Sequence, residues 1–407
     1  MPKPVLSVFS PELMEADQSA FVALMKHLAQ IDRDHRVVMV QVNNETGMLG
    51  DSRDRSALAD AAWKQPVPQP LLRYLASHRT ALKPELASMW ARQGNRSYGS
   101  WAEVFGNSEQ ADEVFMAWHF GRYMEALASA GKRALALPMY TNGWLGPQDG
   151  QPTAGHFPSG GPARRVLDVW RAAAPSLDLL APDIYVPGAK AAMADYHYAG
   201  NPLFVPEAQF RAGDMFWALG HHAAIGYSVF GIEDGRLDGQ LAQAFALLGP
   251  MNDVITKAQA EGRISGILLE DGHQAEIKLG KYTITVRETA VVLKQMLLDA
   301  GLQAPPTPPP LPSETEGPSS RPIPGDSRPF GLVIDQGDGN FLVVGKGFNV
   351  DFGIGSKLAE FDRVEEGRFE ADAWKVGRII NGDERLNIIP MDHIGMVRVR
   401  LLPPLAN

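Results

Sequence analysis

The chain has 407 residues, with 38 Lys and Arg against 47 Asp and Glu, so its formal net charge is −9. This acidic balance argues against a nucleic-acid partner or an anionic membrane surface, because both attract basic proteins. The chain has no Cys, which excludes disulfides, thiolate metal sites and cysteine nucleophiles. The sequence contains no run of about 18 apolar residues, so no membrane-spanning helix is predicted. The composition is that of a globular protein and leaves homo-oligomerisation open.

Helices and strands alternate through the first 262 residues. Residues 19–30 place Phe21, Leu24, Met25 and Leu28 on one helical stripe. The apolar run 36–42 (RVVMVQV) predicts a strand covered on both faces, as in a parallel sheet. Further helices are predicted over 111–130, 164–178, 214–224 and 239–261, and further strands over 133–140, 179–185, 202–208 and 226–233; residues 187–199 lead into the strand 202–208.

This alternation predicts a mostly parallel α/β domain. Each predicted strand ends in polar or acidic residues, namely Asn44 and Glu45, Asn142, Asp183 and Tyr185, Glu207, and Glu233. In (β/α)8 barrels the chemistry lies at the carboxyl ends of the strands. A doubly wound open sheet is the alternative, but it usually has a Gly-rich phosphate-binding turn, which these strands lack. The pattern therefore favours a barrel.

The periodicity changes after residue 262. Segments 264–270 and 274–287 flank Asp271-Gly272-His273, which predicts a hairpin. A Pro-rich stretch then predicts a spacer lying on a surface. We expect four parts: a barrel domain (1–262), a joining hairpin and helix (263–302), a Pro-rich linker (303–327) and a β-sandwich-like accessory domain (328–407).

Two glutamates are the strongest candidates for chemistry. Glu45 ends the strand in VQVNNETG, and Glu207 ends the strand in NPLFVPEAQF. A carboxyl group that closes an apolar strand sits where burial and a neighbouring carboxylate shift its pKa. Glycoside hydrolysis uses such a pair, one carboxyl as proton donor and the other at the anomeric carbon. Each Glu taken singly has a structural alternative, a strand cap or an ion pair with Arg, but the pair favours catalysis.

These segments resemble known glycosidases. QVNNETG resembles the QVENE(T/Y)G signature of glycoside hydrolase family 35 β-galactosidases, and PLFVPEA resembles the segment that holds the nucleophile in the same clan of retaining enzymes. The resemblance implies that Glu45 is the acid/base, Glu207 the nucleophile and Asn44 the donor to the sugar 2-hydroxyl. Asn43 departs from the signature, which usually has Glu at this position.

Other candidates for substrate binding are weaker. Tyr185 resembles the clan's tyrosine that hydrogen-bonds the nucleophile, and Asn142 is a candidate for a sugar hydroxyl. Trp217 and Phe230 are candidates for the aromatic face on which a pyranose stacks. Each has a structural alternative in packing or in a turn. The segment 85–107, with two Trp residues, is predicted to be a lid or a loop at the leaving-group subsite.

The resemblance also predicts that the chain lacks the first part of a barrel. If residues 36–42 form the fourth strand, only about 35 residues precede them, whereas three βα units need roughly 100. A leader segment would then lie upstream, and the N-terminus itself shows no signal peptide, so the compartment, periplasmic or cytoplasmic, stays open.

The sequence thus predicts a retaining exo-β-glycosidase, with β-galactosidase activity favoured, that acts on an oligosaccharide or glycoside. It predicts no metal or organic cofactor, because two carboxyl groups suffice for this chemistry. One alternative is a non-catalytic carbohydrate-binding protein or decayed glycosidase. The other is the same fold acting on a β-xyloside, β-glucoside or arabinoside.

Overall fold

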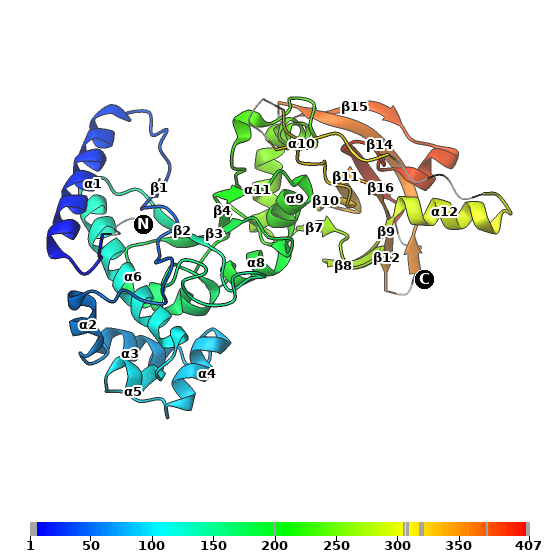
Figure 1. Ribbon diagram of the computed structural model, residues 1–407. Coiled ribbons are helices and arrows are strands. Elements are labelled where there is room, and N and C mark those ends of the chain that lie inside the picture. The colour runs from blue at the N-terminus through cyan, green and yellow to red at the C-terminus, as the bar shows by residue number, and fades with distance from the viewer. Residues whose placement is uncertain are drawn as a thin grey trace. The chain divides into compact units, whose positions relative to one another are not determined.

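Figure 1 shows the computed structural model of the protein, which describes residues 6–198, 200–303, 306, 309–316, 321–355, 357–371 and 373–403. The protein is a mixed α/β structure with a parallel sheet and a C-terminal region of antiparallel sheets, as predicted in outline. It divides into two compact units: unit 1 is Met1–Val186 with Ala191–Pro206, and unit 2 is Pro187–Lys190 with Glu207–Asn407. The predicted domain boundaries stay predictions.

Unit 1 is mostly helical. Its helices are α1 (Pro11–Ile31), α2 (Ala57–Trp63), α3 (Gln69–Ser77), α4 (Pro84–Arg92), α5 (Trp101–Phe105), α6 (Glu109–Ala134) and α7 (Leu167–Ala173), and α8 (Ala189–Tyr196) crosses the division between the units. Its strands are β1 (Val40–Gln41), β2 (Met139–Trp144), β3 (Leu179–Ile184) and β4 (Phe204–Val205).

Helix α1 packs along the long, largely buried helix α6. The Ser10 side chain accepts a hydrogen bond from Leu13 N, so the helix begins well before the predicted residues 19–30. Met25 is buried as its stripe position predicts, but Leu24 is 49% exposed. The buried face is narrower than predicted because α1 has one main neighbour, α6.

The segment 85–107 is not an irregular loop. It folds into α4 and α5, and both of its tryptophans point into the protein, with Trp90 4% and Trp101 1% exposed. The Trp101 ring packs edge-on against Phe115 of α6, with ring centroids 5.2 Å apart. The tryptophans that suggested a ligand-facing loop therefore belong to a hydrophobic core.

The parallel sheet of unit 1 orders β1, β2 and β3 side by side. β3 is buried throughout, as predicted for residues 179–185. β1 is much shorter than the predicted strand 36–42, and Val38 is 74% exposed. The prediction of a strand covered on both faces is wrong here, because only two residues pair with β2 at the edge of the sheet. β2 begins later than predicted because α6 continues to Ala134.

His119 of α6 lies in an aromatic cluster. Its ring is 4.4 Å from that of Phe9 and 4.6 Å from that of Phe115, measured between centroids. Burial lowers the pKa of His119 to about 4, because the cationic form loses hydration there. The unfolded chain binds a proton at this imidazole below about pH 6.5, but the folded chain binds it only near pH 4. The free energy of unfolding therefore decreases as the pH falls between these values.

Replacing His119 by Phe should remove this pH dependence. Between pH 7 and pH 4.5 the wild-type chain should lose up to about 3 kcal/mol more free energy of unfolding than His119→Phe. Urea titrations followed by tryptophan fluorescence at the two pH values measure the difference. His27→Gln, on the exposed side of α1, is the matched control. Parallel losses in wild type and His119→Phe would contradict the assignment.

Unit 2 contains the remaining elements. Its helices are α9 (Ala212–His221), α10 (Gln240–Leu248), α11 (Asn252–Ala260) and α12 (Thr289–Asp299), with two short strands, β5 (Glu207–Ala208) and β6 (Gly226–Tyr227). One antiparallel sheet has the order β15 (Ala373–Ile379), β14 (Phe361–Glu370), β16 (Gly395–Leu401), β11 (Asn340–Lys346), β10 (Phe330–Gly337) and β7 (Ile264–Leu268). The other has the order β13 (Lys357–Ala359), β12 (Phe348–Ile354), β9 (Tyr282–Glu288) and β8 (Gln274–Leu279).

The two antiparallel sheets share one hydrophobic core, to which Val343 of the first and Phe352 of the second both contribute. The hairpin predicted around residues 271–273 is absent, because β7 and β8 belong to different sheets and the tight turn instead joins β8 to β9. Helix α9 covers the outer face of the first sheet. A Cβ on Gly220 would lie 2.4 Å from Gly266 N, so this close approach requires glycine.

The Pro-rich stretch is anchored where the structure describes it; residues 304, 305, 307, 308 and 317–320 lie outside the described part. We call residues 309–316 and 321–328 the strap. Glu314 is 4% exposed and accepts hydrogen bonds from the backbone N–H groups of Gln240 and Leu241, at the start of α10. Asp326 is also buried and accepts one from Gly213 N, at the start of α9.

The described strap lies mostly on the surface, as its composition predicts, but two buried carboxylates anchor it to helices. Its carboxylates satisfy amide groups that a helix leaves unpaired at its N-terminus, and they suit the positive end of the helix dipole. Arg328 strengthens this attachment, because its guanidinium binds Asp326 through two hydrogen bonds of 2.8 and 2.6 Å and lies 2.8 Å from Asp214. Within the described residues, no helix is long and apolar enough to cross a membrane.

Candidate active site

The predicted site residues are divided between the two units. Asn44, Glu45, Asn142 and Tyr185 belong to unit 1, at or just beyond the ends of β1, β2 and β3. The others belong to unit 2, with Glu207 at the start of β5, Trp217 in α9 and Phe230 after β6.

Asn142 is the centre of the polar residues in unit 1. Its side chain is fully buried, and its Nδ2 donates hydrogen bonds to Asp183 Oδ2 (2.7 Å) and Asn44 Oδ1 (2.9 Å). Its Oδ1 accepts hydrogen bonds from Glu45 N (3.0 Å) and Gln41 Nε2 (3.1 Å). One amide group thus joins the ends of three neighbouring strands, and its orientation is set by a backbone donor on one side and a carboxylate on the other.

The same network fixes the orientation of the Asn44 amide. Its Oδ1 accepts hydrogen bonds from Asn142 and from Gln41 Nε2 (2.8 Å). Its Nδ2 must therefore point away from both donors, and it makes no hydrogen bond within the described residues. Asn44 is exposed, so this nitrogen is available to an acceptor on a ligand.

The loop that carries Glu45 has a strained backbone. Asn43 has φ of 65° and Glu45 has φ of 42°, both in the left-handed region that residues with a side chain usually avoid. Asn adopts this conformation more readily than most residues with a side chain, which suits Asn43 to its place in the loop. The hydrogen bond from Glu45 N to Asn142 helps to hold the loop, and such strain is common at functional sites.

Close packing holds the next residue of the loop. A Cβ on Gly161 would lie 2.3 Å from the carbonyl oxygen of Thr46, so the chain needs glycine where it passes this loop. Thr46 itself is 8% exposed, whereas Glu45 beside it is half-buried. The loop therefore rests on a packed base and presents Glu45 at the surface of unit 1.

Three members of the network were missed as site residues. Gln41 donates to both asparagines and accepts a hydrogen bond from the Tyr140 hydroxyl (2.7 Å), and Asp183 fixes Asn142. Asp183 was recognised only as a polar strand end. The signal for Gln41 is its place as the single polar residue in the apolar run VVMVQV.

Tyr185 directly follows β3 and is 41% exposed.

In unit 2, Phe230 lies close to the strand that begins with Glu207. The Phe230 N–H donates to the carbonyl oxygen of Ala208 (3.1 Å), and the residue is 66% exposed. Trp217 lies in a different place, a cavity of about 330 Å³ lined in part by β7 and β8. Its ring stacks on the His221 ring, with the two centroids 4.1 Å apart. The Lys190 ammonium lies over the same Trp217 ring, 4.5 Å from its centroid. Of these two aromatic candidates, Phe230 is the one placed beside Glu207.

A family model described as "Domain of unknown function (DUF5597)" matches residues 241–391. The match begins in α10 and includes the strap and most strands of the two antiparallel sheets. No curated protein matches the chain significantly. Within the described residues, no group of three or more His, Asp or Glu side chains is arranged to hold a metal ion.

Replacing Asn142 by Ala should destabilise unit 1. The change removes four hydrogen bonds from a buried site and takes one donor from the buried Asp183 carboxylate. We expect a loss of about 2–4 kcal/mol in the free energy of unfolding, measured by urea titration. Asn107→Ala, in an exposed loop, should change it by less than about 0.5 kcal/mol. Equal effects of the two substitutions would show that the network does not support the loop.

Proposed function

We propose that the protein is a retaining exo-β-glycosidase that removes terminal, non-reducing β-D-galactosyl residues. Glu45 is the acid/base and Glu207 the nucleophile. The proposal includes the finer architecture expected from the sequence, a partial (β/α)8 barrel that lacks its first strands, followed by a β-sandwich-like domain. It rests on the resemblance of the segments around both glutamates and on the arrangement of the strand ends in unit 1.

The observation that carries the proposal is the Asn142 network. It holds the backbone of Glu45 and the Asn44 side chain at the carboxyl ends of parallel strands, where α/β barrels place their chemistry. It also turns the Asn44 Nδ2 donor outward, as a contact with a sugar hydroxyl requires. Strained backbone that its surroundings hold in place is common at functional sites, and this supports a role for Glu45.

The reaction needs two steps. Glu45 in its protonated form donates a proton to the leaving oxygen while the Glu207 carboxylate attacks the anomeric carbon, which gives a covalent glycosyl-enzyme. Glu45, now a carboxylate, then takes a proton from water as the water attacks the same carbon, which breaks the bond to Glu207 and releases its carboxylate. This mechanism requires the two carboxyl groups to stand about 5–5.5 Å apart across the sugar. Asn44 would hydrogen-bond the 2-hydroxyl, and Phe230 is the candidate for the apolar face of the ring.

Hydrolysis of a panel of nitrophenyl glycosides tests the activity and the sugar. We expect the β-galactoside to be cleaved faster than the β-glucoside, the β-xyloside and the α-L-arabinoside. Glu207→Gln should lower the rate on the β-galactoside by at least about 10³-fold, because the nucleophile is lost. Glu45→Gln should lower it by about 10²–10⁴-fold on substrates whose leaving group needs a proton, and by less on an activated aryl group. Glu15→Gln, exposed on α1, is the control.

Azide distinguishes the two roles. Added azide should restore product formation in both glutamate variants, giving the α-galactosyl azide with Glu207→Ala and the β-galactosyl azide with Glu45→Ala. The reason is that azide replaces the nucleophile in the first case and attacks the glycosyl-enzyme in the second. A Glu207 variant that keeps more than about a tenth of the wild-type rate would contradict the proposal. So would a wild-type chain that binds galactosides without cleaving any of them.

A further inference from the structure

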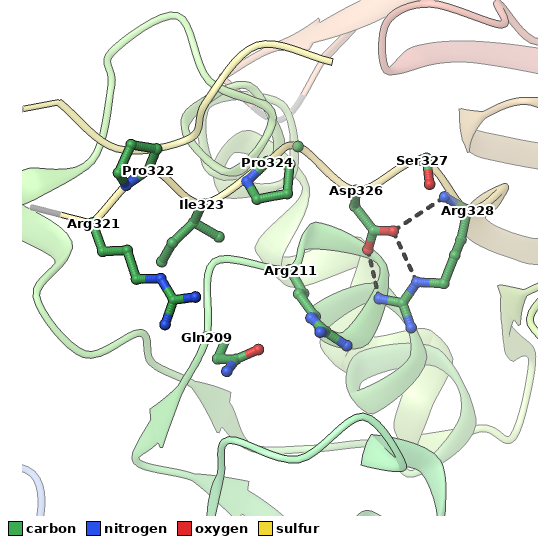
Figure 2. Close-up of a pocket in the computed structure, with 10 residues that line it drawn as sticks. Gln209, Arg211, Arg321, Pro322, Ile323, Pro324, Asp326, Ser327 and Arg328 are labelled. Atoms are coloured by element: carbon green, nitrogen blue, oxygen red, sulfur yellow. Dashed lines mark hydrogen bonds and ion pairs between the residues drawn. The ribbon is translucent and has the colours of Figure 1, made fainter. Parts of the chain in front are cut away.

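A cavity of about 520 Å³ lies in unit 2 between the strap and the loop that joins β5 to α9. The loop contributes Gln209 and Arg211, and the strap contributes residues 321–328. Figure 2 shows the guanidinium groups of Arg211 and Arg321 and the Gln209 amide on the same side of the strap. The cavity is of the size that proteins use for small-molecule ligands.

The side chains that line this cavity carry a net positive charge, because three arginines face one carboxylate, Asp326. Asp326 pairs with the Arg328 guanidinium through two hydrogen bonds and accepts a third from Arg328 N, as the dashed lines in Figure 2 show, and it also accepts one from Gly213 N. Arg328 in turn pairs with Asp214 and Glu270. By contrast, neither Arg211 nor Arg321 makes an ion pair in the part of the chain that the structure describes. In a chain of net charge −9, two unpaired guanidinium groups that line one cavity are a specific feature.

The other walls indicate what kind of anion fits. Pro322, Ile323 and Pro324 form an apolar side, and Gln209 adds an amide group to the lining. Guanidinium groups bind carboxylates through paired, planar hydrogen bonds. An apolar wall and an amide suit the C–H face and the hydroxyls of a sugar ring better than they suit a bare inorganic anion. The lining therefore matches a sugar that bears a carboxylate.

The cavity is next to the proposed nucleophile along the chain. Gln209 follows Glu207 by two residues and is the first residue after β5, so the cavity lining begins where the strand that carries Glu207 ends. We propose that this cavity binds the carboxylate of a uronic acid joined to the galactosyl unit that is cleaved, so that the natural substrates are acidic oligosaccharides. The cleavage part of this inference rests on the proposed function, whereas the binding part stands on the cavity itself.

Two disaccharides that differ at one carbon test the inference. Galactosyl-β-1,4-glucuronic acid and lactose differ only in the carboxylate at C6 of the second sugar. Isothermal titration calorimetry with the full-length Glu207→Gln chain measures both affinities without hydrolysis. We expect the acidic disaccharide to bind at least about tenfold more tightly at low salt, and we expect this preference to shrink as salt increases.

Removing the two charges should abolish the preference. The double variant Arg211→Gln, Arg321→Gln should bind the acidic disaccharide no better than lactose, with its lactose affinity unchanged. The single variant Arg321→Gln, at an exposed position, should lose part of the preference without affecting folding. Arg79→Gln, Arg92→Gln removes two exposed charges of unit 1 and should keep it in full. Inorganic sulfate should bind the wild-type chain much more weakly than the acidic disaccharide.

Several results would overturn the inference. Equal affinity for the two disaccharides would do so, as would an acid preference that survives the double variant, or sulfate binding as tight as that of the acidic disaccharide. These results are separate from the hydrolysis assay. If the chain binds the uronate through both arginines but cleaves no glycoside, the cavity assignment stands and the glycosidase proposal fails. If the chain cleaves neutral and acidic galactosides equally well, with or without the two arginines, the glycosidase proposal stands and the cavity assignment fails.

Discussion

A buried amide must find partners for both its nitrogen and its oxygen, and this requirement organises the strand ends of unit 1. Asn142 is shielded from bulk solvent, and its four hydrogen bonds come from residues beyond or within the neighbouring strands. Leaving one of them unmade would cost about 1–3 kcal/mol, comparable with the cost of the left-handed backbone at Asn43 and Glu45. The strained loop and the amide therefore support each other.

Much of this arrangement follows from local sequence signals, and the rest depends on neighbours that no local signal reveals. The long apolar stripe of α6 and the fully buried β3 are strong patterns, and polar residues after apolar runs mark the strand ends. At residues 36–42 the same hydrophobic character led to the wrong prediction of a strand covered on both faces, because a run of Val and Met is equally compatible with an exposed edge of a sheet. Trp90 and Trp101 suggested a ligand surface, but only the position of α6 determines that they face inward.

The site itself was predictable as a set of residues but not as a network. A strand-end asparagine is visible in the sequence, whereas its bonds to Gln41 and Asp183 depend on the parallel register, which pairs Gln41 with Tyr140 and Asn142 with Ala181. The strap shows the limit of composition most clearly. Its prolines indicate an extended chain without regular hydrogen bonds, and that much holds, but the two carboxylates that bind helix N-termini are single residues within an otherwise ordinary spacer.

These attachments also set an order of events for the nascent polypeptide. The backbone N–H groups of Gln240 and Leu241, at the start of α10, have their acceptor in Glu314, which follows them by more than seventy residues. The acceptor of Gly213 N is Asp326, which is still further along the chain. Until the ribosome has released that stretch, the first turns of α9 and α10 have bare amides that water must solvate. Because such distant contacts form slowly, unit 2 should reach its final form only after translation has passed residue 326.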